Sequence, residues 1–212
     1  MDIRQNLTSQ STQPITHQWL MSLLRDYKRP NDKVLDLVRL QWLQPVKRGI
    51  YIAGPALDAD NPEPFLLANH ILGPSYVSLE SALSHHGLIP EQVFEIASVT
   101  VKASRRFSTP VGVFSYTRLP LPYYAFGIQQ WKLTDRQFVM GASPEKALCD
   151  KVITTSGLVF RSKSAAKDWL LSNMRMGEEE LKALDIPAIR QWLADAPKSD
   201  SLEKMIETIA SL

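Results

Sequence analysis

Two stretches near the start of the chain place hydrophobic side chains at the spacing of a helix. Thr16 can cap the first stretch, and Asn31 or Asp32 the second, because short polar side chains accept hydrogen bonds from the free N–H groups of a first helical turn. Residues 28–31 (Lys-Arg-Pro-Asn) separate the two stretches. The pattern therefore predicts two short helices, with Leu20, Leu23, Leu24 and Tyr27 on one side of the first and Val34, Leu35, Val38 and Trp42 on one side of the second.

A basic hairpin is expected directly after these helices. Residues 43–52 contain two short hydrophobic runs with Lys47-Arg48-Gly49 near their turn. Two helices followed by a basic hairpin are typical of the last two helices and the wing of a winged helix-turn-helix. Such a unit places one helix in the major groove of DNA and the cations of the wing on phosphates. The candidate DNA-binding residues are therefore Lys33, Arg39, Lys47 and Arg48.

A winged helix normally has one more helix before these two. Residues 1–14 are mostly polar and are a poor candidate for it, so the first helix is expected to be shortened or missing. The alternative interpretation of the whole segment is a structural subdomain with a solvated basic face.

Positive charge is concentrated in the same part of the chain. Residues 1–56 contain 8 Lys/Arg and 4 Asp/Glu, whereas residues 57–140 contain 6 and 7, and residues 141–212 contain 10 and 11. The total of +2 is too small to identify a nucleic-acid-binding protein by bulk charge. The distribution nevertheless favours the N-terminal segment as the one that meets a phosphate backbone.

Residues 55–64 are rich in proline, aspartate and asparagine and are interpreted as a linker. A short helix then opens with residues 65–68. Residues 75–90 predict a capped helix: Ser78 is the expected N-cap, and Gly87 suits the left-handed position past the helix end. Leu88 is expected to fold back onto Leu83, and Pro90 prevents the helix from continuing.

Several short strands should follow, and we expect them to be antiparallel. The strand candidates are residues 93–102, 111–117, 126–128, the region of Trp131, and 138–140. Between the first two lies a basic connection, in which Arg105, Arg106 and Phe107 form an exposed loop. This loop is either a solubilising hairpin tip or a partner-binding site.

The last third of the chain is predicted to be helical. Ser143, Pro144 and Glu145 have the order of a cap, a first-turn proline and an acid near the positive end of the helix dipole. Four further helical pieces are expected at residues 164–174, 178–184, 186–194 and 202–212. We interpret these pieces as a cap on the sheet, with a partner-binding surface as the alternative.

Catalytic and cofactor chemistry is not indicated by the sequence. The chain has no glycine-rich phosphate loop and no G-x-S-x-G motif. Adjacent His85 and His86 point about 100° apart on a helix and cannot chelate one metal as an i, i+4 pair could. Cys149, the single cysteine, is expected to be half-buried and unreactive. The chain is accordingly predicted to be a non-enzyme without metal or cofactor.

A cytoplasmic location is expected from three features. The single cysteine allows no intrachain disulfide, which suits a reducing compartment. The first fifteen residues lack the hydrophobic stretch of a secretory signal, and no run approaches the roughly 20 apolar residues of a membrane-spanning helix.

Two blocks of sequence resemble a known family. Residues 76–83 (Tyr-Val-Ser-Leu-Glu-Ser-Ala-Leu) with residues 86–88 (His-Gly-Leu) are similar to the Y-(V/I)-S-x-E-S-A-L-x-x-x-G-L block of the AbiEi antitoxin family. Residues 143–150 (Ser-Pro-Glu-Lys-Ala-Leu-Cys-Asp) are similar to its P-E-(K/R)-A-L-x-D block. The resemblance covers residues 41–157 well and the helical tail loosely.

The resemblance implies an α+β protein with a winged helix-turn-helix at residues 1–54, a linker at 55–64 and an antitoxin domain at 65–212. It also implies that the protein represses its own operon through DNA binding and counters a nucleotidyltransferase-like AbiEii toxin without a stable complex. Arg105, Arg106 and Phe107 are the candidate partner-binding residues. The alternatives are an interaction protein of the same fold that does not bind DNA, and a nuclease-like enzyme, which the lack of a carboxylate cluster disfavours.

Overall fold

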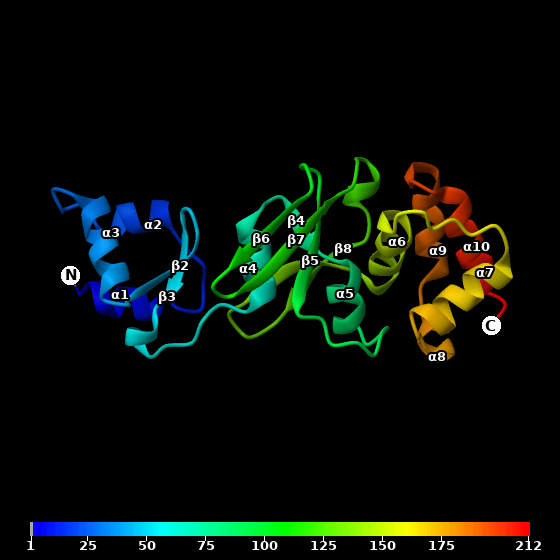
Figure 1. Cartoon of the computed structure of the whole chain (residues 1–212), viewed down its shortest axis with the longest axis horizontal. Coiled ribbons are helices and arrows are strands. Elements are labelled where there is room, and N and C mark those ends of the chain that lie inside the picture. Colours follow the sequence, from blue (N-terminus) through cyan, green and yellow to red (C-terminus); the bar gives the residue numbers. More distant parts are fainter. Residues whose placement is uncertain (1) are drawn as a thin grey trace.

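The computed structural model describes residues 2–212, which form a mixed α+β fold with ten α-helices and two sheets (Figure 1). An N-terminal unit (residues 2–57) lies at one end of the elongated molecule, a six-stranded sheet lies in the middle, and helices gather at the other end (Figure 1). The sheet and these helices form the C-terminal unit (residues 64–212). No helix among residues 2–212 is long and apolar enough to cross a membrane.

The N-terminal unit contains three helices and a three-stranded antiparallel sheet. Its strand order is β1-β3-β2, and a register shift between Pro45 and Lys47 interrupts the β2–β3 pairing. The elements in chain order are α1 (Ile3–Ser9), β1 (Ile15–Thr16), α2 (His17–Leu23), α3 (Pro30–Arg39), β2 (Leu43–Lys47) and β3 (Ile50–Ala53).

Helix α1 lies in the segment of residues 1–14, which the sequence made a poor candidate for a helix. The side chain of Asp2 caps α1 by accepting a hydrogen bond from the backbone N–H of Arg4. Leu7 is fully buried in the core of the N-terminal unit. One buried leucine and one cap anchor this seven-residue helix, so it lacks the repeated hydrophobic stripe by which helices are found in a sequence.

The small sheet separates two hydrophobic clusters. Ile15 and Leu43 pack with the helices of the N-terminal unit. Val46, Ile50 and Ile52 instead belong to the large cluster of the C-terminal unit. The sheet is therefore buried on both faces, and the β2–β3 hairpin is packed against the neighbouring unit.

The predicted linker is partly structured. Pro55–Leu57 forms a 3-10 helix, and Leu57 is buried in the N-terminal cluster. Helix α4 (Pro64–Ile71) then begins at a first-turn proline, which confirms the short helix expected there.

The six-stranded sheet has the order β6-β7-β5-β4-β9-β8 and is mixed. The expectation of antiparallel strands is wrong for two pairs, because β4 runs parallel to β9 and β5 runs parallel to β7. Strand β7 pairs on one side with β6, which precedes it in the sequence, and on the other side with β5, which is more distant in the sequence. The strands are β4 (Ser75–Val77), β5 (Glu95–Thr100), β6 (Arg105–Thr109), β7 (Gly112–Arg118), β8 (Ile128–Lys132) and β9 (Phe138–Ala142).

Strand β6 replaces the predicted basic loop. Residues 105–109 pair antiparallel with β7, with Arg106 opposite Ser115 and Phe107 opposite Phe114. As an edge strand with solvent on its outer side, β6 buries little, and Phe107 is its one hydrophobic residue. The alternation that marks a half-buried strand is therefore missing from its sequence.

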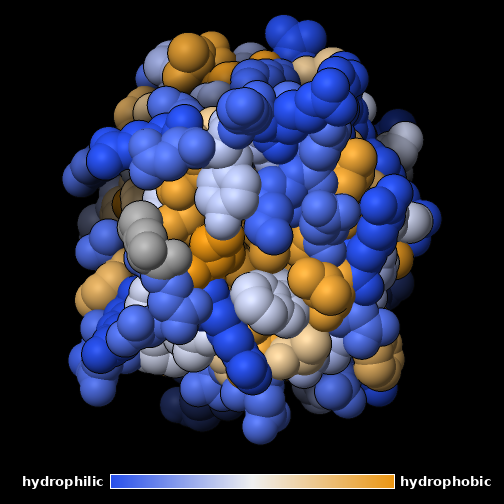
Figure 2. Space-filling model, turned by 90° about the vertical axis from the view of Figure 1, so that its left-hand side faces the viewer, coloured by the Kyte–Doolittle hydropathy of each residue, from blue (hydrophilic) through white to orange (hydrophobic). Residues whose placement is uncertain are grey.

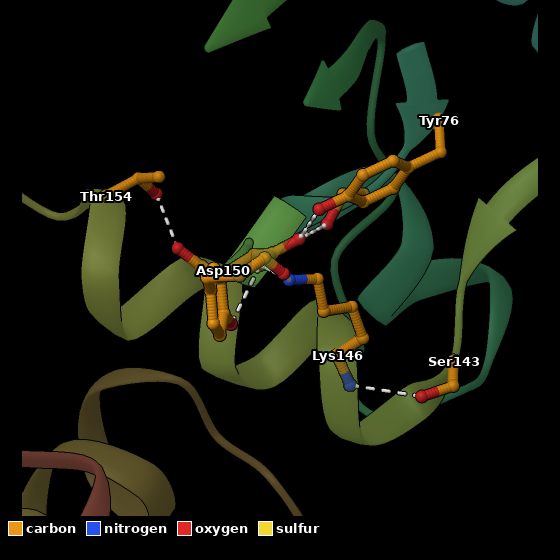
Figure 3. Close-up of polar contacts among 7 residues, drawn as sticks. Tyr76, Ser143, Lys146, Asp150 and Thr154 are labelled. Atoms are coloured by element: carbon orange, nitrogen blue, oxygen red, sulfur yellow. Dashed lines mark hydrogen bonds and ion pairs between the residues drawn. The ribbon is translucent and has the colours of Figure 1, made fainter. Parts of the chain in front are cut away.

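Two helices pack against the sheet and carry the capped turns that the sequence predicts. Helix α5 (Leu79–His85) is followed, after its C-cap His86, by Gly87, whose φ is +71°, and the N–H of Leu88 donates to the carbonyl of Leu83. Helix α6 (Pro144–Thr154) is capped by Ser143, whose hydroxyl accepts from the N–H of Lys146 (Figure 3). Both helix ends are confirmed.

The helical tail is confirmed with small shifts of its bounds. It covers the end of the molecule opposite the N-terminal unit (Figure 1). Its elements are α7 (Lys163–Asp168), which continues as a π-helix over Trp169–Asn173, α8 (Glu178–Lys182), α9 (Ile186–Trp192) and α10 (Ser199–Ile209).

Candidate functional site

Helix α3 offers its outer side to solvent at the far end of the N-terminal unit (Figure 1). Figure 2 shows this end of the molecule: hydrophilic side chains surround a patch of hydrophobic ones. Val34 and Leu37 are the residues of α3 that are buried, whereas Leu35 and Leu40 are 56% and 53% exposed. Asp36 also lies on the exposed side. The outer side of α3 is thus mixed in character and only partly basic.

The predicted cations of α3 differ in their surroundings. Arg39 forms an exposed ion pair with Asp36 at 3.4 Å, and Arg29 at the start of the helix pairs with Asp32 at 3.7 Å. The ammonium group of Lys33 lies 5.7 Å from the centre of the Tyr27 ring. Surface pairs of this kind contribute little energy and exchange readily for other partners, so Lys33 and Arg39 remain accessible to an anionic ligand.

Lys47 and Arg48 are neighbours with different partners. The ammonium of Lys47 donates to the backbone carbonyl of Ile71 at 2.6 Å and lies 5.0 Å from the centre of the Phe107 ring. Both contacts join the N-terminal unit to the C-terminal unit. Arg48 is exposed at the turn of the hairpin and forms no ion pair within residues 2–212. Only Arg48 of the two is therefore free to reach a phosphate without breaking a contact between the units.

Arg105, Arg106 and Phe107 do not form the exposed loop that we expected. Arg106 pairs with Glu95 on β5, with its Nη2 atom 2.7 Å from a carboxylate oxygen. Phe107 packs edge-on against Tyr116 and beneath Lys47. Arg105 is exposed on the edge strand. A partner could reach Arg105, whereas Phe107 is already part of the contact between the units.

A buried polar network connects the two blocks of the family resemblance (Figure 3). Asp150 on α6 is fully buried, and each of its carboxylate oxygens has two partners. Oδ2 accepts from the hydroxyls of Tyr76 at 2.9 Å and Ser78 at 2.7 Å. Oδ1 accepts from Tyr123 at 3.0 Å and lies 3.1 Å from the ammonium of Lys146. Every polar atom around the carboxylate is thus satisfied by the protein itself.

Lys146 is as deeply buried as Asp150. Its ammonium also donates to the carbonyl of Tyr123 at 2.9 Å and lies 3.3 Å from the centre of that ring. Burial lowers the pKa of Lys146 and raises the pKa of Asp150, because both charged forms lose their hydration. Burial also raises the pKa of Tyr76, so its hydroxyl stays protonated and donates. None of these groups is open to solvent, so the network joins α6 to β4 and holds the fold together.

Ser78 has a role other than the predicted one. It precedes α5, but its side chain makes no capping hydrogen bond and instead donates to Asp150. Next to it, Leu79 has a φ of +54°, a left-handed conformation that costs a leucine energy. Glu80, two residues after Ser78, forms an ion pair with Lys151, the residue after Asp150. The strained residue is therefore held between two bonds to α6.

His85, His86 and Cys149 have structural surroundings. His85 stacks on Trp131 with ring centres 4.2 Å apart, and a ring nitrogen of His86 lies 2.9 Å from the carbonyl of Ala142. Cys149 is fully buried, which corrects the expectation that it is half-buried, and burial raises the pKa of its thiol. Residues 2–212 contain no group of three or more metal-ligating side chains.

The sequence did not predict the hydrogen-bond network around Asp150, although most of its residues lie in the two blocks that were singled out. Tyr76, Ser78, Lys146 and Asp150 all belong to the two blocks that resemble the AbiEi family. No family model matches the chain, and no curated protein matches it. Its function is therefore inferred from its own residues and geometry together with the resemblance of these blocks.

Proposed function

We propose that this protein is a DNA-binding regulator whose N-terminal unit is a winged helix-turn-helix. The observation that carries the proposal is the order of elements, α1-β1-α2-α3-β2-β3, with the strand order β1-β3-β2. In a winged helix this order places α3 as the recognition helix and the β2–β3 turn as the wing. Helix α1 lies before α2 and α3 in the chain, and this third helix supports the proposal.

The position of α3 supports this role. The opposite side of the N-terminal unit is the side that packs against the C-terminal unit through Val46, Ile50 and Ile52. Helix α3 lies away from that contact and is accessible along its outer side (Figure 1). A duplex can approach α3 without separating the two units, and the excess positive charge of residues 1–56 favours that approach.

The proposal is tested by the salt dependence of DNA binding. The double variant Lys33→Ala, Arg39→Ala in the full chain is expected to bind a duplex about 10- to 100-fold more weakly, with a shallower dependence of log K on log salt. The double variant Lys163→Ala, Lys167→Ala removes the same charge from the other end of the molecule and should bind like the wild type. Equal binding by all three proteins would refute a role for α3.

We further propose that the C-terminal unit carries an antitoxin activity against a nucleotidyltransferase-like toxin. The support is the resemblance of two blocks to the AbiEi family, together with the contact of those blocks through Asp150 and through the Glu80–Lys151 pair. The two blocks are distant in the sequence but pack against each other in the C-terminal unit. Arg105 is the candidate contact that remains accessible on β6.

Co-expression with the toxin tests this second activity. Full-length point variants are preferable to a truncation, because removing residues 1–56 would expose the hydrophobic surface that Val46, Ile50 and Ile52 cover. Arg105→Ala is expected to reduce protection of the cells, and Arg118→Ala, an exposed cation on the adjacent strand, serves as the control. Full protection by Arg105→Ala would remove β6 as the site.

One observation favours an interaction protein that does not bind DNA. Leu35 and Leu40 are more than half exposed on α3, and each acid of the helix pairs with an arginine. A surface of this kind also suits contact with another protein. The salt titration separates the two functions, since a protein-binding surface predicts no measurable affinity for a duplex at low salt.

A further inference from the structure

A pocket of about 520 Å³ lies at the turn of the β2–β3 hairpin. It is lined by His17, Arg48, Gly49 and Tyr51. Backbone pairing builds it: Thr16 lies opposite Ile50 in the sheet, and the N–H of His17 donates to the carbonyl of Gly49 at 2.9 Å. Gly49 has a φ of +83°, which lets the chain reverse tightly between the arginine and the tyrosine.

The polar side chains around this pocket are all hydrogen-bond donors. The guanidinium of Arg48 has N–H donors, the ring of His17 has one or two, and Tyr51 has a hydroxyl donor. No carboxylate lines the pocket. The pocket therefore suits an anion with several acceptor oxygens.

These donors are also uncommitted, in contrast to other cations of the unit. Arg25, Arg29 and Arg39 each form an ion pair, and Lys47 bonds to a carbonyl of the C-terminal unit. Within residues 2–212 the side chains of His17, Arg48 and Tyr51 take part in no hydrogen bond or ion pair. These donors therefore bond to solvent and can exchange water for the oxygens of a ligand without breaking a contact within the protein.

We propose that His17, Arg48 and Tyr51 together bind one phosphate of the DNA backbone. The inference rests on the proposed function, because a winged helix places its wing beside the backbone. Arg48 supplies the charge, while Tyr51 and His17 donate hydrogen bonds that orient the phosphate. The pocket contacts no base, so it contributes the same binding free energy for every DNA sequence.

The first test measures binding of the full chain to a short random-sequence duplex over a series of salt concentrations. Arg48→Gln should lower the slope of log K against log salt by about 0.9, the value for one phosphate contact. Tyr51→Phe keeps the ring that packs in the N-terminal core and should weaken binding about 10-fold at unchanged slope, and His17→Gln should weaken binding to a similar extent. Lys167→Gln on α7 is the matched control and should bind like the wild type.

The second test replaces single phosphates of the duplex by neutral methylphosphonates. One replacement should weaken binding to the wild type but not to the triple variant His17→Gln, Arg48→Gln, Tyr51→Phe, because both changes remove the same contact. If every replacement weakens both proteins equally, the pocket does not hold a backbone phosphate.

The outcomes separate the pocket from the proposed function. A wild type that binds no duplex at low salt would overturn both. A wild type that binds, with Tyr51→Phe and His17→Gln indistinguishable from it, would overturn the pocket alone. If inorganic phosphate at matched ionic strength raises the melting temperature of the wild type and not of the triple variant, while duplex binding is unchanged, the pocket binds free phosphate and the DNA assignment is wrong.

Discussion

Asp150 shows how a single residue can determine the stability of the C-terminal unit. Moving a carboxylate and an ammonium out of water costs several kcal/mol for each ion, and their attraction offsets this only when all remaining hydrogen-bonding groups are satisfied. Asp150 and Lys146 meet that condition through Tyr76, Ser78 and Tyr123. Such a network specifies one arrangement of α6 against β4, since any other arrangement leaves a buried charge without partners.

Removal of Lys146 is therefore expected to be costly. Lys146→Met fills a similar volume but leaves the Asp150 carboxylate without its cation, and should lower the free energy of unfolding by about 3–5 kcal/mol. Lys151→Met breaks a partly buried pair on the same helix, which keeps contact with solvent, and should cost about 0–1 kcal/mol. Urea denaturation followed by circular dichroism measures both. Similar costs for the two variants would mean that Lys146 is not a buried ion.

Two glycines with left-handed backbone conformations differ in the space that a side chain would have there. Gly87 and Gly127 both have positive φ, but a Cβ at Gly87 would meet no atom within 4 Å, whereas a Cβ at Gly127 would lie 2.7 Å from Lys146 and 2.8 Å from Trp192. Gly87→Ala should thus cost only its backbone strain, about 1–2 kcal/mol. Gly127→Ala should lower the melting temperature clearly more, and equal melting temperatures would show that one of these backbone positions is wrongly assigned.

At the scale of elements, the β2–β3 hairpin has two neighbouring cations with separate tasks. Lys47→Ala should leave the Ile71 carbonyl without its partner and reduce stability by about 1–3 kcal/mol, with the salt dependence of DNA binding unchanged. Arg48→Ala should do the opposite, changing DNA binding and not stability. Denaturation and duplex titration of both variants check this, and loss of DNA binding on Lys47→Ala alone would reverse the assignment.

The edge strand β6 is held to β5 by Glu95, across β7. The hydrogen bonds from Arg106 hold the pKa of Glu95 below its usual value. Since the folded state lowers this pKa, the pair stabilises the fold above the unfolded pKa, and the contribution is lost as the pH falls through the folded pKa. The stability of the wild type should therefore fall more steeply than that of Glu95→Gln between about pH 5 and about pH 3. Parallel curves from denaturation at each pH would exclude the pair as a stabilising contact.

The elements that could be predicted from sequence are those with local causes. The caps of α6 and the glycine after α5 depend on residues within one turn, and both were found. Helix α1, strand β6 and the parallel pairs depend on contacts with distant residues, so local patterns did not reveal them. The same holds for the candidate sites: Arg48 was identified from a basic turn, whereas His17 joins it only through the pairing of β1 with β3. Tyr51 lies on the same hairpin as Arg48 and was not recognised as a polar site residue.

In the whole molecule, the helix α3 and the helical tail lie at opposite ends, with the six-stranded sheet between them (Figure 1). The N-terminal unit directs α3 outward and uses its sheet to pack against the C-terminal unit (Figure 1). The helical tail lies at the opposite end. In the proposed function, DNA binds at the end that carries α3, and the sheet and the tail stay accessible to a second partner.

Hydrogen–deuterium exchange with and without a DNA duplex tests the central claim, that the N-terminal unit is the part that contacts DNA. We predict slower exchange of amides in residues 17–50 on addition of DNA, and no change in α7–α10. Arg48→Gln should reduce the effect at the β2–β3 turn and leave that at α3. Protection confined to the C-terminal unit, with exchange at α3 and the turn unchanged, would contradict the account.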